Sequence, residues 1–336
     1  MTKITFKTKL NFNNKIIFTD GMIGGGKTLI ANLISGLKDV EQWVLDENIE
    51  RICSLNYLKK MDLDTSTDFL KKTLNQKFFD NFILRHANFR KQDLTSFFNN
   101  IRFKDIKKRK NYSVSEAEKK IKKTKMCLQY MTHKNSPYSE PIFKAFGNQL
   151  LYVLILRNPF NIYTINWLAR WIKIFSSFSE RGGRINFYSD KYKVNFPFEI
   201  KNDVNYYQKL NKYEKSIFFM ENYYYGSIKK IKNFSKKYKS NYIIVPFENL
   251  TQNPSKYLKK ISKLSKTKID KLTIKNLKKN NVPRNNPEQT INSSVYDFSK
   301  NLPKESNKFK FLNNKVSDNF LKKILKLEKF YINNIL

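Results

Sequence analysis

Short runs of apolar residues recur along the chain, separated by longer stretches of helical character. Four of them read as strands: Lys15–Thr19, Cys127–Thr132, Leu150–Leu156 and Asn241–Phe247, and Gln42–Glu47 is a fifth candidate. The runs are continuously apolar, as in strands that are buried on both faces of a sheet. Buried strands alternating with helices are typical of a parallel sheet between two helical layers. We therefore predict a three-layer α/β/α fold with a central parallel sheet.

The stretches between the strands predict helices. These are Leu29–Leu37, Ser115–Lys125, Ser139–Phe146, Asn161–Phe175 and a C-terminal helix that starts at Ser317. Ser113 and Glu116 are spaced as a capping box at one of these helix starts. Because we find no repeats and no clear linker, we expect a single domain over residues 1–336. Helical and irregular insertions are expected at about 48–125 and 176–240.

Composition adds a strong positive charge to this picture. The chain has 336 residues, of which 40% are hydrophobic, enough for a packed core. Its formal net charge is +37, which suits a partner rich in phosphate or sulfate. The basic residues are scattered and are mostly Lys, whereas proteins that read nucleic acids are enriched in Arg. We expect no specific nucleic-acid partner. A non-enzymatic protein that binds polyanions is one alternative.

Targeting and metal signals are weak. Cys53 and Cys127 stand far apart without a disulfide or zinc pattern, as in a reducing compartment. The N-terminus lacks the apolar region of a secretory signal, and the aliphatic run Leu150–Leu156 is too short to cross a bilayer. We expect a cytoplasmic protein without a transmembrane segment or a metal site. The oligomeric state is left open.

The segment KIIFTDGMIGGGKTLI (Lys15–Ile30) carries the first chemical signal. Gly21, Gly26, Lys27 and Thr28 fit G-x-x-x-x-G-K-[ST] between a strand and a helix, the context that this motif requires. Glycines let backbone N–H groups turn towards one anion, and the helix directs its positive end to the same point. We therefore predict a fold similar to the P-loop nucleoside triphosphate hydrolases. The predicted phosphate-binding residues are Gly21, Gly24, Gly25, Gly26, Lys27, Thr28 and Leu29.

Two further segments resemble the sulfotransferase family, whose sulfuryl donor is 3′-phosphoadenosine 5′-phosphosulfate (PAPS). In Leu150–Trp171 a strand ends in Arg157-Asn158-Pro159 and a helix follows, as in that family. Tyr242–Ser265 is similar to the family's strand ending in YEDL, followed by DP and a helix, with Glu248 at the acidic position.

The resemblance extends over most of the chain in the family's order, from about Lys15 to Tyr331. Leu128–Pro137 resembles the strand that ends in a Lys/His pair before the family's acceptor pocket. The C-terminal helix is similar to the closing helix of many members. The resemblance thus adds to the fold expected from the apolar pattern and suggests what the glycine loop binds.

The resemblance implies an activity and a set of roles. The chain would transfer the sulfuryl group of PAPS in line to a hydroxyl or amine of a small-molecule, saccharide or lipid acceptor. His133 would be the general base, since it lies at the carboxyl end of a strand and imidazole is the side chain most often used for proton transfer. Lys27 would stabilise charge at the phosphosulfate. Arg157 and Thr164 would hold the 3′-phosphate of the donor, and Arg284 would close over it.

One feature points to a different donor. Lys27 follows Gly26, whereas sulfotransferase loops carry their basic residue before the glycine; nucleotide kinases place it after. An ATP-dependent P-loop kinase that uses magnesium is therefore the main alternative. In it Lys27 and Thr28 would bind the nucleotide with magnesium, and Glu47 would be the carboxylate base at a strand end. Arg181 and Arg184 would be lid arginines that reach the γ-phosphate. The carboxylates that could hold its metal are Asp46, Glu47 and Glu248.

Overall fold

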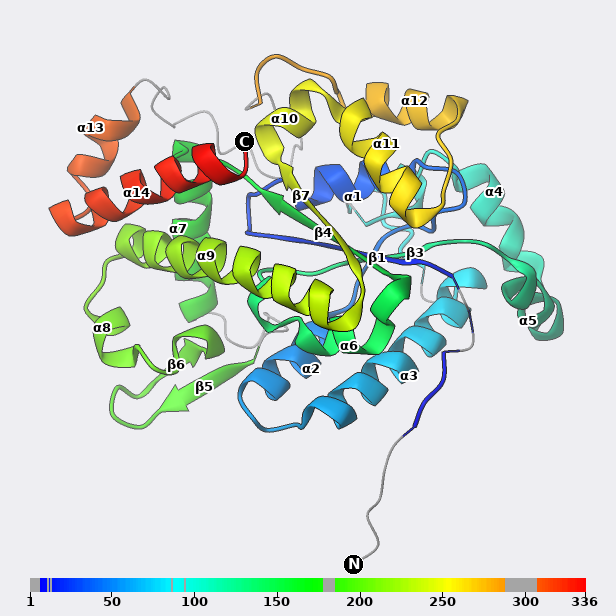
Figure 1. The fold of residues 1–336 in the computed structure, drawn as a ribbon, viewed down its shortest axis with the longest axis horizontal. Helices are drawn as coiled ribbons and strands as arrows, with labels where there is room; N and C mark the ends of the chain where they lie inside the picture. The colour runs from blue at the N-terminus through cyan, green and yellow to red at the C-terminus, as the bar shows by residue number, and fades with distance from the viewer. Residues whose placement is uncertain are drawn as a thin grey trace, which may run out of the picture.

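A five-stranded parallel sheet forms the centre of the protein, with strand order β2-β3-β1-β4-β7 (Figure 1). The computed structural model describes residues 7–10, 12, 14–85, 87–93, 95–177, 185–287 and 307–336, and for 173–177 the backbone alone. The central strands are β1 (Ile16–Gly21), β2 (Val44–Leu45), β3 (Leu128–Met131), β4 (Leu150–Leu156) and β7 (Asn241–Pro246). A separate antiparallel pair consists of β5 (Asn186–Ser189) and β6 (Val194–Pro197).

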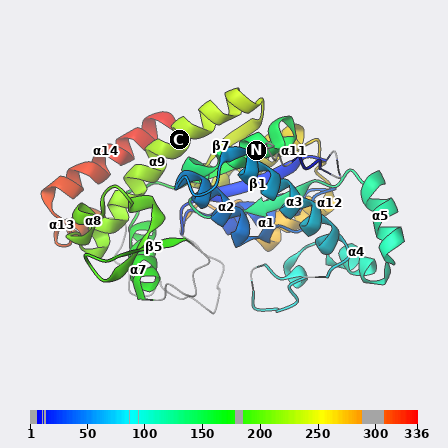
Figure 2. The same ribbon diagram turned by 90° about the horizontal axis from the view of Figure 1, so that it is seen from below.

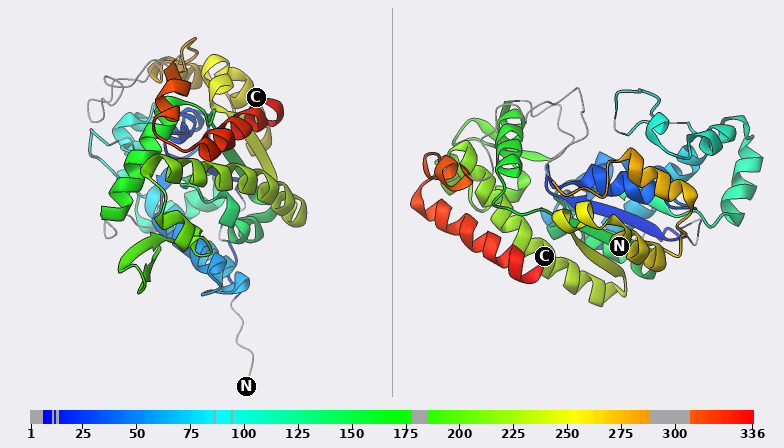
Figure 3. Two further views of the ribbon diagram at one scale, coloured as in Figure 1. Left: turned by 90° about the vertical axis from the view of Figure 1, so that its left-hand side faces the viewer. Right: turned by 90° about the horizontal axis from the view of Figure 1, so that it is seen from above.

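Helices cover both faces of the central sheet. One face carries α1 (Lys27–Ser35), α10 (Phe247–Gln252), α11 (Pro254–Ser265) and α12 (Lys271–Lys279) (Figure 3). The opposite face carries α2 (Glu47–Tyr57), α3 (Leu63–Phe82), α6 (Glu140–Phe146), α7 (Ile162–Ser177), α9 (Lys212–Tyr238) and α14 (Asp318–Asn334) (Figure 2). The shorter helices are α4 (Phe103–Lys107), α5 (Val114–Lys123), α8 (Val204–Gln208) and α13 (Lys308–Asn313). The predicted three-layer α/β/α fold is confirmed.

Successive side chains of the central strands enter two different cores. Ile16 and Phe18 of β1 and Tyr152 of β4 pack on the α9 side, whereas Ile17 and Val153 pack on the α1 side. All five are fully buried. Burial on both faces explains why these strands read as continuous apolar runs. A strand lies in each run predicted as one, although β1 continues two residues beyond the predicted Lys15–Thr19 and β2 is much shorter than the predicted Gln42–Glu47.

The predicted helix starts agree with the structure. Ser113 and Glu116 form a reciprocal capping box at the start of α5, and Ser317 is the residue before α14. The segments expected as insertions supply α2, α3 and α9, which pack against the sheet. None of the described helices is long and apolar enough to cross a bilayer.

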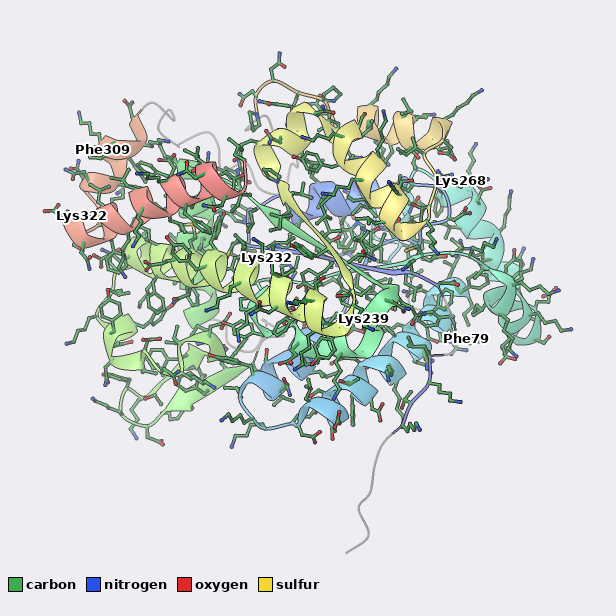
Figure 4. The ribbon with its side chains drawn as sticks, viewed as in Figure 1. Phe79, Lys232, Lys239, Lys268, Phe309 and Lys322 are labelled. Atoms are coloured by element: carbon green, nitrogen blue, oxygen red, sulfur yellow. The ribbon has the colours of Figure 1, made fainter. Side chains whose placement is uncertain are left out.

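Exposed lysine side chains occur on separate parts of the fold. Lys232 belongs to α9, Lys322 to α14 and Lys268 to the turn between α11 and α12, and all three are exposed (Figure 4). The positive charge is therefore distributed over several elements, in agreement with the scatter of lysines along the sequence.

We expect the central core to dominate stability. Leu154 of β4 is fully buried, so Leu154→Ala should lower the free energy of unfolding by about 2–5 kcal/mol through lost burial and a residual cavity. The same substitution at Leu325, which is 37% exposed on α14, should change it by less than about 0.5 kcal/mol. Urea unfolding curves of both variants measure the difference. Equal losses would contradict this description of the core.

Candidate functional site

The chemically distinctive segments leave the sheet at one edge. In a parallel sheet the carboxyl ends of all strands share an edge, where ligands commonly bind. Here β1 leads into the glycine loop, β3 into His133 and β4 into Arg157. Because β3 and β4 are the two neighbours of β1, His133 and Arg157 follow the strands on opposite sides of that loop.

The glycine loop, residues 21–26, turns tightly on itself. Gly24 and Gly26 have φ angles of 78° and 94°, values that favour glycine. The Gly25 N–H donates to the Met22 carbonyl at 3.0 Å, and Lys27 Nζ donates to the same carbonyl at 2.7 Å. The lysine therefore folds back across the loop. Helix α1 begins at Lys27, so its positive end faces the loop.

Aromatic side chains from two helices pack directly on this loop. A Cβ atom at Gly26 would lie 2.3 Å from Phe247 Cδ2, and one at Gly24 would lie 2.9 Å from Trp167 Cδ1. Phe247 opens α10 and Trp167 lies on α7. The loop thus needs glycine both for its backbone angles and for the space that these rings occupy.

Arg157 is held against the rim of the loop. Its guanidinium donates through Nη1 to the Gly24 carbonyl at 3.1 Å. It also lies 4.4 Å from the ring centroid of Phe247 and 4.8 Å from that of Tyr163, as in cation–π contacts. The Tyr224 hydroxyl donates to the Arg157 carbonyl, which fixes the main chain. A planar cation beside the glycine loop suits an anionic group such as a phosphate.

The other residues assigned to the donor have these contacts. Thr164 is buried and donates through Oγ1 to Asn161 Oδ1 at 3.1 Å. Arg284 donates through Nη2 to the Pro287 carbonyl at 3.1 Å, and its backbone N–H donates to the Thr251 carbonyl of α10 at 2.8 Å. Thr28 and Leu29 are half-buried in the first turn of α1, where Leu29 packs on the core of that face.

His133 pairs with a carboxylate that the sequence did not single out. Glu50 Oε1 accepts the His133 backbone N–H at 2.7 Å and lies 3.1 Å from Nδ1 of the same residue. An ionised carboxylate can only accept, so Nδ1 is the donor in the second contact when Glu50 is ionised, and in the neutral imidazole Nε2 then keeps its lone pair. The His133 side chain is 29% exposed and that of Glu50 only 9%.

Glu50 had a weak signal in the sequence. It lies on the face of α2 that also buries Ile49, Ile52 and Cys53. A charged residue at buried helical spacing needs a partner inside the protein. That spacing becomes visible only when the start of α2 is known, and the N-cap residue Asp46 is the residue that marks it.

The carboxylates of the kinase alternative are engaged elsewhere. Asp46 accepts the Asn48 N–H at 3.0 Å and pairs with Lys77 at 3.3 Å. Glu47 pairs with Arg51 at the surface. Glu248 accepts the Asn158 N–H at 2.9 Å and the Tyr331 hydroxyl. Arg181 and Arg184, its lid arginines, lie outside the described residues.

The fold and the glycine loop together define an α/β/α protein of the P-loop class. No protein-family model matches the chain, and no curated protein matches it in sequence.

Two solved structures are similar to it. One is the sulfotransferase domain from the olefin synthase of Synechococcus PCC 7002, at 12% identity and a TM-score of 0.43, over 98% of each chain. The other is the sulfotransferase domain from the curacin biosynthetic pathway, at 11% identity and a TM-score of 0.40, over 96% of this chain and 98% of that one. At such low identity and TM-score, the function has to be inferred from the residues of this chain.

We expect Gly26→Ala to disable the loop. The new Cβ would meet Phe247 at a φ angle that side chains rarely adopt, so the loop must change shape. Binding of pyrophosphate, measured by calorimetry, should weaken at least about tenfold, since a tenfold loss corresponds to about 1.4 kcal/mol. Gly226→Ala on α9 is the control, because its Cβ would meet only ordinary contacts at 3.7 Å. Equal effects of the two substitutions would argue against the loop as the anion site.

Proposed function

We propose that this protein is a sulfotransferase that moves the sulfuryl group of PAPS to a hydroxyl or amine acceptor. The carrying observation is the His133–Glu50 pair at the end of β3, the strand next to the glycine loop. His133 lies at the same edge of the sheet as the glycine loop, so it would be placed to take a proton from an acceptor bound beside the sulfuryl group of the donor. Arg157, beyond the neighbouring strand β4, offers a cation for a further phosphate of the same donor.

The residues present fit such a donor. The rings of Trp167 and Phe247 pack against Gly24 and Gly26 where a Cβ would otherwise lie, and the backbone N–H groups of such a glycine loop would suit the 5′-phosphosulfate. Lys27 is close enough to the loop to bond its backbone, so its charge is available to the same anion. PAPS would supply the activated sulfuryl group. Arg157 would recognise the 3′-phosphate, with Thr164 and Arg284 as its proposed helpers.

The base follows from the tautomer of His133. With Nδ1 donating to Glu50, Nε2 can accept the proton of the acceptor hydroxyl. The carboxylate then stabilises the imidazolium that forms. Loop N–H groups and Lys27 would stabilise the negative charge that develops on the leaving phosphate of the donor. We infer a small-molecule, saccharide or lipid acceptor that approaches the exposed side of His133.

The donor can be identified by titration. Adenosine 3′,5′-bisphosphate should bind without magnesium and at least about tenfold more tightly than AMP, since an extra charge-assisted contact adds roughly 1.5–3 kcal/mol before other costs. Calorimetry with and without magnesium measures both ligands. Magnesium-dependent ATP binding, with no bisphosphate binding at millimolar concentration, would favour the kinase instead.

The base can be tested with a pair of neighbouring glutamates. Glu50→Gln keeps the shape but removes the charge behind His133, so turnover should fall by about 10²-fold or more, the range of general base catalysis. Binding of the bisphosphate should persist in this variant and in His133→Ala. Glu47→Gln, on the surface of the same helix, should leave turnover unchanged.

Turnover is measured as transfer of labelled sulfate from PAPS to a panel of alcohols, saccharides and lipids. A loss in Glu47→Gln with none in Glu50→Gln would move the base to the position that the kinase alternative assigns.

A further inference from the structure

Asp20 is a fully buried carboxylate at the end of β1, directly before the glycine loop. None of the roles assigned above includes it. It accepts five hydrogen bonds, and all the donors are neutral. The donors are Thr132 Oγ1 at 2.9 Å, the Asn135 N–H at 3.2 Å, the Ser136 N–H at 2.8 Å, Ser136 Oγ and the Tyr223 hydroxyl at 2.8 Å. Burial raises the pKa of Tyr223 well above its ordinary value, so this hydroxyl stays a donor.

Four of these bonds come from residues 132–136, the turn that carries His133. The same turn is bonded to β1 through its backbone. The Thr132 N–H donates to the Thr19 carbonyl at 2.9 Å, and the Lys134 N–H donates to the Gly21 carbonyl at 3.1 Å. Lys134 has a φ of 50°, a left-handed conformation that is uncommon outside glycine and that persists when its surroundings hold it.

A carboxylate is a costly choice at this position. Burying an ionised group among neutral donors has an effective cost of several kcal/mol that hydrogen bonds must offset. A neutral residue of similar size would avoid that cost. An amide in its place would direct an NH₂ group at some of the same donors, however, and so could not satisfy them all. Only a carboxylate, with acceptors on both oxygens, can accept hydrogen bonds from all of these donors at once.

We propose that Asp20 is a positioning residue that holds the turn bearing His133 against the glycine loop. Glu50 fixes the imidazole ring, and Asp20 fixes the main chain that presents it. Asp20 also adjoins Gly21, so the turn and the loop share one anchor. That this turn takes part in catalysis rests on the proposed function. That Asp20 holds the turn in place does not depend on it.

The test reads the imidazole directly. The chain has two histidines, His86 and His133; His86 lies outside the described residues, and the spectrum of His133→Ala assigns the signals. In the unmodified protein, ¹⁵N-edited NMR above pH 8 should show His133 protonated on Nδ1. In Asp20→Asn the contact with Glu50 should loosen, and the Nε2–H form should gain population. Asp105→Asn, an exposed matched substitution, should leave the His133 signals unchanged.

Turnover and donor binding separate this inference from the proposed function. In Asp20→Asn, kcat should fall by about 10²-fold, as expected for a small misplacement of a reacting group, while bisphosphate affinity stays within about threefold. If Asp20→Asn does not fold, Ser136→Ala removes one donor and should shift the tautomer in the same direction.

Each outcome has a distinct meaning. An unchanged His133 tautomer in both folded variants would overturn the positioning role, whatever the activity. A shifted tautomer in a protein that binds no bisphosphate would support the positioning role and overturn the sulfotransferase.

Discussion

The parallel pairing of β1 with β3 on one side and β4 on the other is the constraint on which the site depends. Ile16 lies opposite Leu128 of β3 and Leu150 of β4. The pairing with β4 continues to Gly21, the first residue of the glycine loop, which lies opposite Ile155. Arg157 follows Ile155 by two residues, so it leaves β4 beside that loop. The pairing with β3 stops at Thr19. Ending β3 earlier leaves residues 132–136 free to fold around Asp20.

A second constraint fixes the opposite side of the loop. Glu248 accepts the Asn158 N–H at 2.9 Å and also the Tyr331 hydroxyl, which lies 3.2 Å from the Leu156 carbonyl. These contacts join the ends of β4 and β7 to α14. Burial, followed by the nearby Glu248 charge, raises the pKa of Tyr331 above its ordinary value, so the hydroxyl remains a donor. Glu248 thus holds the frame in which Arg157 and Phe247 face the loop.

Local sequence predicted the frame of this protein well. Continuous apolar runs identify β1, β3, β4 and β7, because burial on both faces leaves no polar alternation. The glycine loop was recognisable since its residues are consecutive. Edge strand β2 is short because it pairs with β3 over two residues, a limit that no local pattern encodes.

The carboxylates of the site were not predictable in the same way. Glu50 acts on His133 from 83 residues away, and Asp20 gathers donors from the turn at Ser136, 116 residues later. Each is an ordinary acidic residue in its own segment, and only the strand order brings it to its partners. Thr164 and Arg284 came from family resemblance alone. The Thr164 side chain bonds Asn161 and the Arg284 side chain bonds the Pro287 carbonyl, while the Arg284 N–H donates to the Thr251 carbonyl of α10 at 2.8 Å.

The position of Lys27 is less decisive than it looks in the sequence. A lysine after Gly26 fits a kinase pattern, yet what acts on a ligand is the position of Nζ. Gly26 adopts a left-handed conformation and α1 starts at the next residue, so the side chain of Lys27 returns across the loop to the Met22 carbonyl. Its charge thus lies against the backbone of the loop itself. The choice between the two proposed donors therefore depends on the groups around the loop, among which Arg157, His133 and Glu50 are the residues on which the sulfotransferase proposal rests.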